Sequence, residues 1–271
     1  MKVFISVDIE GIAGFVNWQQ CSASDPGYRT AIDLMTGEAN AAIAGAFDAG
    51  ADEVLVDDSH GNQRNMSPLE LDPRARLVIG GTKPLSMMQG IDESFDAVFL
   101  VGYHAGAGFN GGLSHTYDGT VSVVRLNGMQ VGEITINAAV AGYFGAPVAL
   151  VTGDSAACRE AKATLSAVET VAVKEPISRY SANCLSPAAA REKIRAGCSA
   201  ALARIGDMEP FTLEPPVRFE LTFNNVGFAD RVSLMPGTKR VDPLTVAYES
   251  DDCITAYQGF LTMLVLAESV G

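Results

Sequence analysis

The sequence is poor in basic residues, histidine and cysteine, and each shortage excludes a class of protein. Its 271 residues hold 19 lysines and arginines against 32 acidic residues, a formal net charge of −13. Such a chain lacks the basic face that a nucleic-acid partner requires. The five cysteines include no Cys-x-x-Cys pair. We therefore expect neither a disulfide framework nor a thiolate zinc site, as is typical of cytoplasmic proteins.

Long apolar runs are also missing. No stretch approaches the roughly 20 residues that a helix needs to span a bilayer, so no membrane contact is expected. The N-terminus enters a predicted strand without a basic and then apolar signal segment, which again favours the cytoplasm. Hydrophobic residues make up 48% of the chain and charged residues 19%, a balance typical of globular proteins.

The hydrophobic pattern alternates between predicted strands and helices, which indicates an α/β fold with right-handed crossovers. We expect a mostly parallel, doubly wound sheet with helices on both faces over residues 1–175. Residues 175–187 then cross to a smaller C-terminal α+β subdomain over 188–271. The strands are predicted at 3–7, 53–56, 76–79, 97–101, 147–151, 171–173, 217–223 and 244–248, and the main helices at 29–49, 133–143, 154–165, 188–205 and 252–268.

One glycine-rich stretch, AGAGFNGG at 105–112, contains a literal G-x-G-x-x-G after a predicted strand. A dinucleotide fingerprint also needs a helix that opens at its glycines. Here the sequence continues in a β-like pattern and reaches Asn127-Gly128, which predicts a hairpin turn. We therefore interpret the stretch as a flexible loop that carries His115.

Five side chains form a candidate metal site because most of them follow predicted strands. Asp8 and Glu10 come after the first strand, and His60 and His104 follow two others. Ligands of open α/β sheets bind beyond the carboxyl ends of the strands, so these groups should meet at one edge. Glu133, in the first turn of a predicted helix, completes the set. Each residue alone also has a purely structural interpretation, because acids favour helix N-termini and turns.

The ligand types favour zinc or a similar divalent ion over calcium or magnesium. If one carboxylate bridges, the five side chains supply three bonds to each of two ions, which leaves room for a shared water as in hydrolytic two-metal sites. His115 is then the one histidine without a metal role. It is either an exposed loop residue or a general acid/base.

The motifs that carry these residues resemble a known family, the zinc D-aminopeptidases of the DppA type (peptidase family M55). The similar segments are SVDIEGIAG at 6–14, VDDSHG at 56–61, VGYHA at 101–105, LSHT at 113–116 and VGEITINAAVAGYFGAPV at 131–148, with KEPISRYSANCLSP, LMPGT and AYQ further along the chain.

The resemblance implies a cytoplasmic dizinc aminopeptidase that removes N-terminal D-amino acids, chiefly D-Ala, from short peptides and amides. Asp8 would bridge two Zn²⁺ ions, with Glu10, His60, His104 and Glu133 as the other ligands. His115 would be the catalytic residue, which is described in the family as a nucleophile. From the residues we favour acid/base assistance by His115 to a metal-activated water. The resemblance also implies a homodecamer of two stacked pentameric rings.

Two other interpretations remain open from the sequence. The same site could serve another metal-dependent amidase or a phosphoesterase. A phosphoesterase should place a cation beside the metals, for which Lys83 and Arg125 are the nearest candidates. The protein could instead be a ring-forming scaffold or a metal store, although ligands that leave coordination positions open are typical of catalysis.

Overall fold

The first strand, β1 (Lys2–Val7), lies in the middle of a seven-stranded sheet in the computed structural model, which describes residues 1–270. The other strands of this sheet are β2 (Glu53–Asp58), β3 (Arg76–Val78), β4 (Ala97–Tyr103), β7 (Val148–Asp154), β8 (Glu169–Ser178) and β9 (Ser181–Cys184). They lie in the order β3-β2-β1-β4-β7-β8-β9. All neighbours are parallel except β9, which runs antiparallel to β8.

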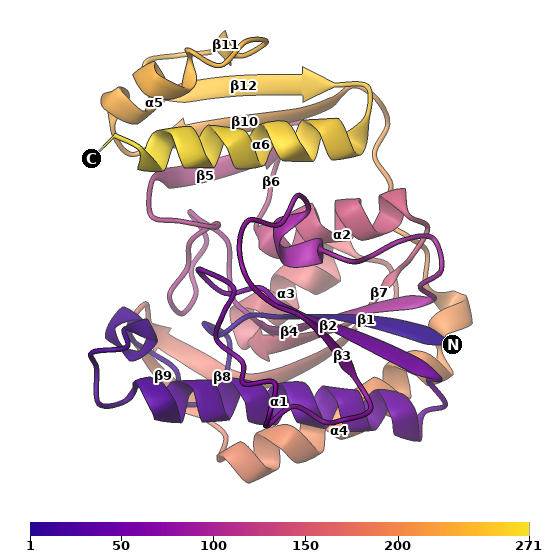
Figure 1. Ribbon diagram of the computed structural model, residues 1–271. Helices are drawn as coiled ribbons and strands as arrows, with labels where there is room; N and C mark the ends of the chain where they lie inside the picture. Colours follow the sequence, from indigo (N-terminus) through magenta and orange to yellow (C-terminus); the bar gives the residue numbers. More distant parts are fainter. Residues whose placement is uncertain (271) are drawn as a thin grey trace.

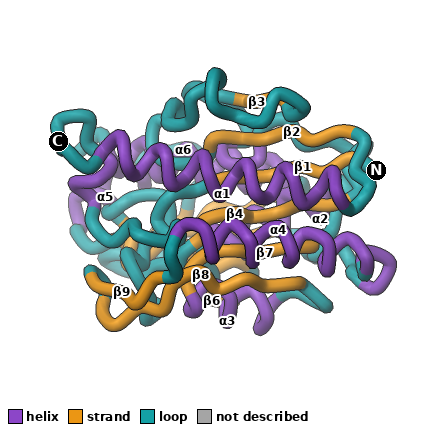
Figure 2. The backbone as a smooth tube through the Cα atoms, turned by 90° about the horizontal axis from the view of Figure 1, so that it is seen from below, coloured by secondary structure: helices purple, strands orange, loops and turns teal. Residues whose placement is uncertain are grey.

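Helices cover both faces of this sheet, as Figure 1 shows. One face packs against α1 (Tyr28–Asp48) and α4 (Pro187–Ala203), which lie side by side across the strands in Figure 2. The other face packs against α2 (Glu133–Tyr143) and α3 (Ser155–Thr164). Since β1 and β4 are buried on both faces, their sequences are almost continuously apolar. The predicted doubly wound α/β fold is confirmed.

A second, antiparallel sheet lies beyond α2 (Figure 1). Its strands, in the order β11-β12-β10-β5-β6, are β11 (Lys239–Arg240), β12 (Thr245–Ser250), β10 (Val217–Phe223), β5 (Val121–Leu126) and β6 (Met129–Gln130). The helix α6 (Cys253–Glu268) packs on this sheet, on the short helix α5 (Val226–Val232) and on α2. Asn127 and Gly128 form the predicted hairpin turn between β5 and β6, both with positive φ.

The two sheets divide the chain differently from the predicted boundary. Strand β8 continues to Ser178 and turns into β9, where the sequence predicts a crossing segment over 175–187. Helix α4 packs on α1 and the first sheet, whereas β5 and β6 join the second sheet. The hairpin and its partner β10 are far apart in sequence, and no local pattern reveals such a pairing.

The remaining short helices are η1 (Trp18–Cys21), η2 (Ser86–Met88) and η3 (Ile205–Asp207). The glycine-rich stretch 105–112 opens no helix, and β5 is the next element after it. It therefore lacks the helix that a dinucleotide fingerprint needs. Among residues 1–270, no helix combines the length and apolarity needed to cross a membrane.

Candidate metal centre

The predicted ligands lie at the carboxyl edge of the first sheet. Asp8 directly follows β1, His104 directly follows β4, and His60 lies two residues beyond β2. The turn after β1 packs closely on the end of β4, because a Cβ atom at Gly11 would lie only 1.9 Å from the backbone oxygen of Tyr103. The Gly11 N–H also donates to the Gly102 carbonyl at 2.7 Å. A glycine is therefore required at position 11 to bring the Asp8 turn against His104.

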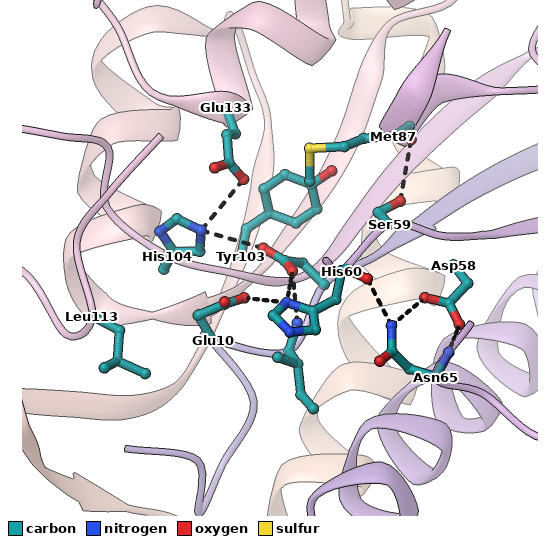
Figure 3. Close-up of polar contacts among 12 residues, drawn as sticks. Glu10, Asp58, Ser59, His60, Asn65, Met87, Tyr103, His104, Leu113 and Glu133 are labelled. Carbon is teal, nitrogen blue, oxygen red and sulfur yellow. Dashed lines mark hydrogen bonds and ion pairs between the residues drawn. The ribbon is translucent and has the colours of Figure 1, made fainter. Parts of the chain in front are cut away.

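Asp8 lies between two pairs of side chains, and the four members of these pairs are labelled in Figure 3. His60 Nδ1 is 3.3 Å from Asp8 Oδ1 and 3.1 Å from Glu10 Oε2. His104 Nε2 is 3.3 Å from Asp8 Oδ2 and 3.3 Å from Glu133 Oε2. One pair is thus Glu10 with His60, the other is Glu133 with His104, and Asp8 offers one oxygen to each.

The charges of this cluster are strongly coupled. Burial disfavours the cationic form of both histidines, but the adjacent carboxylates outweigh it and hold the pKa of His60 and of His104 well above the ordinary value. Burial likewise opposes the ionised form of Asp8, yet the neighbouring His104 and His60 lower its pKa well below the usual range. A positive charge at the centre of the cluster would therefore stabilise the buried carboxylates.

A divalent cation such as zinc fits this donor set. Glu10 Oε1 and His104 Nε2 are buried and have no hydrogen-bond partner among the described residues. Around them are three groups of three His, Cys, Asp or Glu residues, and within each group the potential ligand atoms lie within 4.8 Å of one another. Buried polar atoms without partners are rare, and a cation would satisfy both.

Backbone contacts orient the two histidines. His104 Nδ1 lies 2.9 Å from the Ala105 carbonyl, which leaves Nε2 to face the carboxylates. Behind His60, the Asn65 side-chain amide donates to the His60 carbonyl at 2.7 Å and to Asp58 at 2.8 Å (Figure 3). The Asp58 carboxylate also accepts the backbone N–H of Asn65 and of Met66. The loop after β2 is therefore held rigidly.

His115 lies against this cluster from the glycine-rich side. Its ring stacks on His104 with the centroids 4.2 Å apart, and Trp18 contacts it edge-on at 4.9 Å. His115 Nδ1 lies 2.9 Å from the Leu113 carbonyl, and Nε2 is 3.9 Å from Glu10 Oε1. Burial and the nearby His104 charge lower the pKa of His115. This favours the neutral form of the imidazole, which can accept a proton.

Comparison with known proteins agrees with this geometry. Residues 1–262 match the D-aminopeptidase family, peptidase family M55. A curated D-aminopeptidase from Bacillus subtilis (strain 168) is 40% identical over 270 residues, which cover 98% of both chains. The chain belongs to peptidase family M55. It is therefore a hydrolase of the aminopeptidase class, as its sequence predicts.

A solved structure of this family has the same fold. The Zn-dependent D-aminopeptidase DppA from Bacillus subtilis, described as a self-compartmentalizing protease, superposes with a TM-score of 0.98 at 38% identity. The match covers 100% of this chain and 99% of that chain. The fold and the family predicted from the sequence motifs are thereby confirmed.

The cluster of Asp8, Glu10, His60, His104 and Glu133 faces a cavity of about 380 Å³, a size typical of small-ligand sites. Sequence reasoning missed several of the residues there. Trp18, Asp118 and Arg179 line the cavity, and the Cys21 sulfur lies within 4.8 Å of ligand atoms of Glu10 and His60. Trp18 and Cys21 belong to a segment predicted only as a loop, so neither gave a sequence signal.

The two cations considered for a phosphoesterase are not in this cavity. The Lys83 side chain is buried, and its ammonium group pairs with Asp57 and donates to the Asp58 carbonyl at 2.8 Å. Arg125 is an exposed residue of β5 in the second sheet. Neither residue lines the cavity, so neither is placed to bind a phosphate beside the metal ligands.

Two buried charged residues, Lys174 and Glu38, form hydrogen bonds with the backbone of the turn that carries Glu10. Lys174 on β8 donates to the carbonyl of Glu10 and, at 2.5 Å, to that of Phe15. Burial lowers the pKa of Lys174. The buried carboxylate of Glu38 on α1 accepts the Ala13 N–H at 2.9 Å, whereas its second oxygen has no partner among the described residues. Both buried residues thus fix the backbone that carries Glu10.

Glu38 should make stability depend on pH. Burial raises its pKa from 4.5 to about 7 against the opposing effects of the Ala13 N–H and Lys174. The folded protein thus binds a proton that the unfolded chain releases, so this contribution to stability falls as pH rises from 4.5 to about 7. Between these pH values the free energy of unfolding of the parent should therefore fall by up to roughly 3 kcal/mol more than that of Glu38→Gln.

Urea unfolding of both proteins below and above this range measures the difference. Glu192→Gln, at an exposed position of α4, is the control. An equal pH response of the parent and Glu38→Gln would contradict a buried, protonated Glu38.

Proposed function

We propose that the protein is a dizinc aminopeptidase that removes N-terminal D-amino acids, chiefly D-Ala, from short peptides and amides. The Asp8-centred cluster, which faces a cavity of peptide size, carries this proposal. Asp8 would bridge two Zn²⁺ ions, with Glu10 and His60 on one side and His104 and Glu133 on the other. When bound, such ions polarise a carbonyl and acidify water toward neutral pH.

The chain's own residues supply the rest of the reaction. Asp118, the carboxylate of the cavity lining that is not a proposed zinc ligand, attracts the free ammonium group of the substrate and holds it beside the cluster. His115 Nε2 accepts a proton from the attacking water and delivers it to the departing nitrogen. Trp18, packed against His115, excludes bulk water on that side. Because the Leu113 carbonyl already holds His115 Nδ1, proton transfer at Nε2 requires little reorganisation.

The proposal includes an assembly. We propose a cytoplasmic homodecamer of two stacked pentameric rings, a form of self-compartmentalization like that ascribed to the Bacillus subtilis protein. Large apolar side chains that a monomer would leave in water support it, namely Leu69, Ile177, Tyr180 and Leu234. The mass in solution, measured by light scattering, tests this assembly directly. A monomer at cellular concentration would contradict it.

One assay separates the proposed peptidase from a phosphoesterase at the same site. The purified, zinc-loaded enzyme is incubated with D-Ala-D-Ala, with L-Ala-L-Ala and with a generic phosphoester. We expect release of D-Ala from the first, little reaction with the second, and no phosphate from the third. Removal of the metal by a chelator should abolish the reaction, and added Zn²⁺ should restore it. Phosphate release without release of D-Ala would contradict the proposal.

A further inference from the structure

The cavity has one basic side chain. Its acidic lining comprises Asp8, Glu10, Asp118 and Glu133, whereas Arg179 is the single lysine or arginine among the described residues that line it. A second, adjoining hollow of about 440 Å³ shares His115, Asp118 and Arg179 with the first. Arg179 therefore lies where the two hollows meet, and among the described residues that line them it is the one lysine or arginine.

Arg179 is attached to the segment that carries His115. It follows β8, and its backbone carbonyl accepts the Leu113 N–H at 2.8 Å. One guanidinium nitrogen donates to the Ser114 carbonyl at 3.0 Å. These two bonds hold the arginine beside the cavity and leave most of its five N–H donors free.

No carboxylate neutralises this guanidinium. Within residues 1–270, Arg179 takes part in no ion pair, although the acidic residues of this chain pair with most of its other arginines. A guanidinium fork with free donors is the group best suited to bind a carboxylate with two parallel hydrogen bonds. The cavity thus matches a short peptide with its amino end at the metal cluster and its carboxylate at Arg179.

We propose that Arg179 binds the C-terminal carboxylate of the substrate, so that the enzyme prefers free peptides of two or three residues. This inference rests on the proposed function, because it places the amino end of the same peptide at the metal cluster. A short peptide has both charges within reach of one cavity, whereas a longer or amidated peptide offers no carboxylate at that position.

The experiment compares D-Ala-D-Ala with D-Ala-D-Ala amide in the zinc-loaded enzyme. We expect the parent to hydrolyse the free acid with a kcat/KM about 10- to 100-fold higher, the range expected for charged hydrogen bonds. Arg179→Gln should remove this preference by raising KM for the acid, with the amide reaction unchanged. Arg179→Lys, which keeps the charge but not the fork, should retain part of it. Arg125→Gln, remote on β5, is the matched control.

The outcomes separate the inference from the function on which it rests. Equal loss with both substrates would mean that Arg179 only supports the His115 segment, and unchanged discrimination would mean that it binds no carboxylate. Either result overturns the inference while leaving the peptidase intact. If the parent hydrolyses neither peptide, the proposed function itself fails and the inference fails with it.

Discussion

Replacing Asp8 with Asn is expected to remove most of the bound zinc and to lower kcat/KM for D-Ala-D-Ala by roughly a thousandfold or more. The reason is geometric. Asp8 contacts His60 through Oδ1 and His104 through Oδ2, so it is the one carboxylate that belongs to both pairs of ligands. An amide keeps the shape but loses one acceptor oxygen and the negative charge, which weakens both halves of the site at once.

Elemental analysis after dialysis gives the zinc content per chain. The parent should hold two equivalents, and Glu10→Gln, which disturbs only one pair, should hold between one and two. Asp118→Asn, which alters a carboxylate of the same cavity outside the cluster, is the control for metal content. Full zinc occupancy in Asp8→Asn would exclude Asp8 as the bridging ligand.

The sequence predicts this cluster well because its members follow strands whose order obeys a simple rule. Strands β2, β1 and β4 are adjacent and parallel, so the residues after them must meet at one edge. The apolar runs before Asp8, His60 and His104 identify those strands without any tertiary information. Glu133 is different, because it follows no strand of this sheet: the sequence places it in the first turn of a predicted helix, and its approach to the cluster depends on how α2 packs.

The surroundings of the cluster could not be predicted in the same way. Trp18 reaches the cavity from the short helix η1 and Arg179 from the turn after β8, where side-chain direction depends on tertiary contacts rather than on periodicity. The continuation of β8 to Ser178 was missed because KEPIS includes charged residues and a proline, which weaken an apolar strand pattern. Lys174, within that strand, can be buried because its ammonium group donates hydrogen bonds to two backbone carbonyls.

Replacing His115 with Gln is expected to leave two zinc ions per chain in place and to lower kcat by about 100- to 10,000-fold, the range of general acid/base catalysis. His115 stacks on His104. Its Nε2 is 3.9 Å from Glu10, whereas His60 is 3.1 Å from Glu10 and His104 is 3.3 Å from Glu133. Glutamine keeps a hydrogen-bonding group of similar length but cannot exchange a proton near pH 7. Activity and metal content should therefore separate in this variant.

The metal measurement also decides a structural alternative. His115, His104 and Glu133 offer ligand atoms within 4.8 Å of one another, so a loss of one zinc equivalent in His115→Gln would make His115 a ligand. Glu133→Gln provides the comparison, since it should lose zinc together with activity. Equal losses of zinc in the two variants would contradict an acid/base role.

A further measurement separates acid/base assistance from nucleophilic attack by His115. If His115 only moves protons, added imidazole should restore part of the activity of His115→Gly, and rapid quenching should reveal no enzyme-bound acyl group. A nucleophilic His115 would instead carry the D-aminoacyl group, detectable as a mass increase on the peptide that contains residues 113–116. The close approach of His115 to Glu10 and His104 favours the first result, because an acyl group on Nε2 would have to fit within this packed cluster.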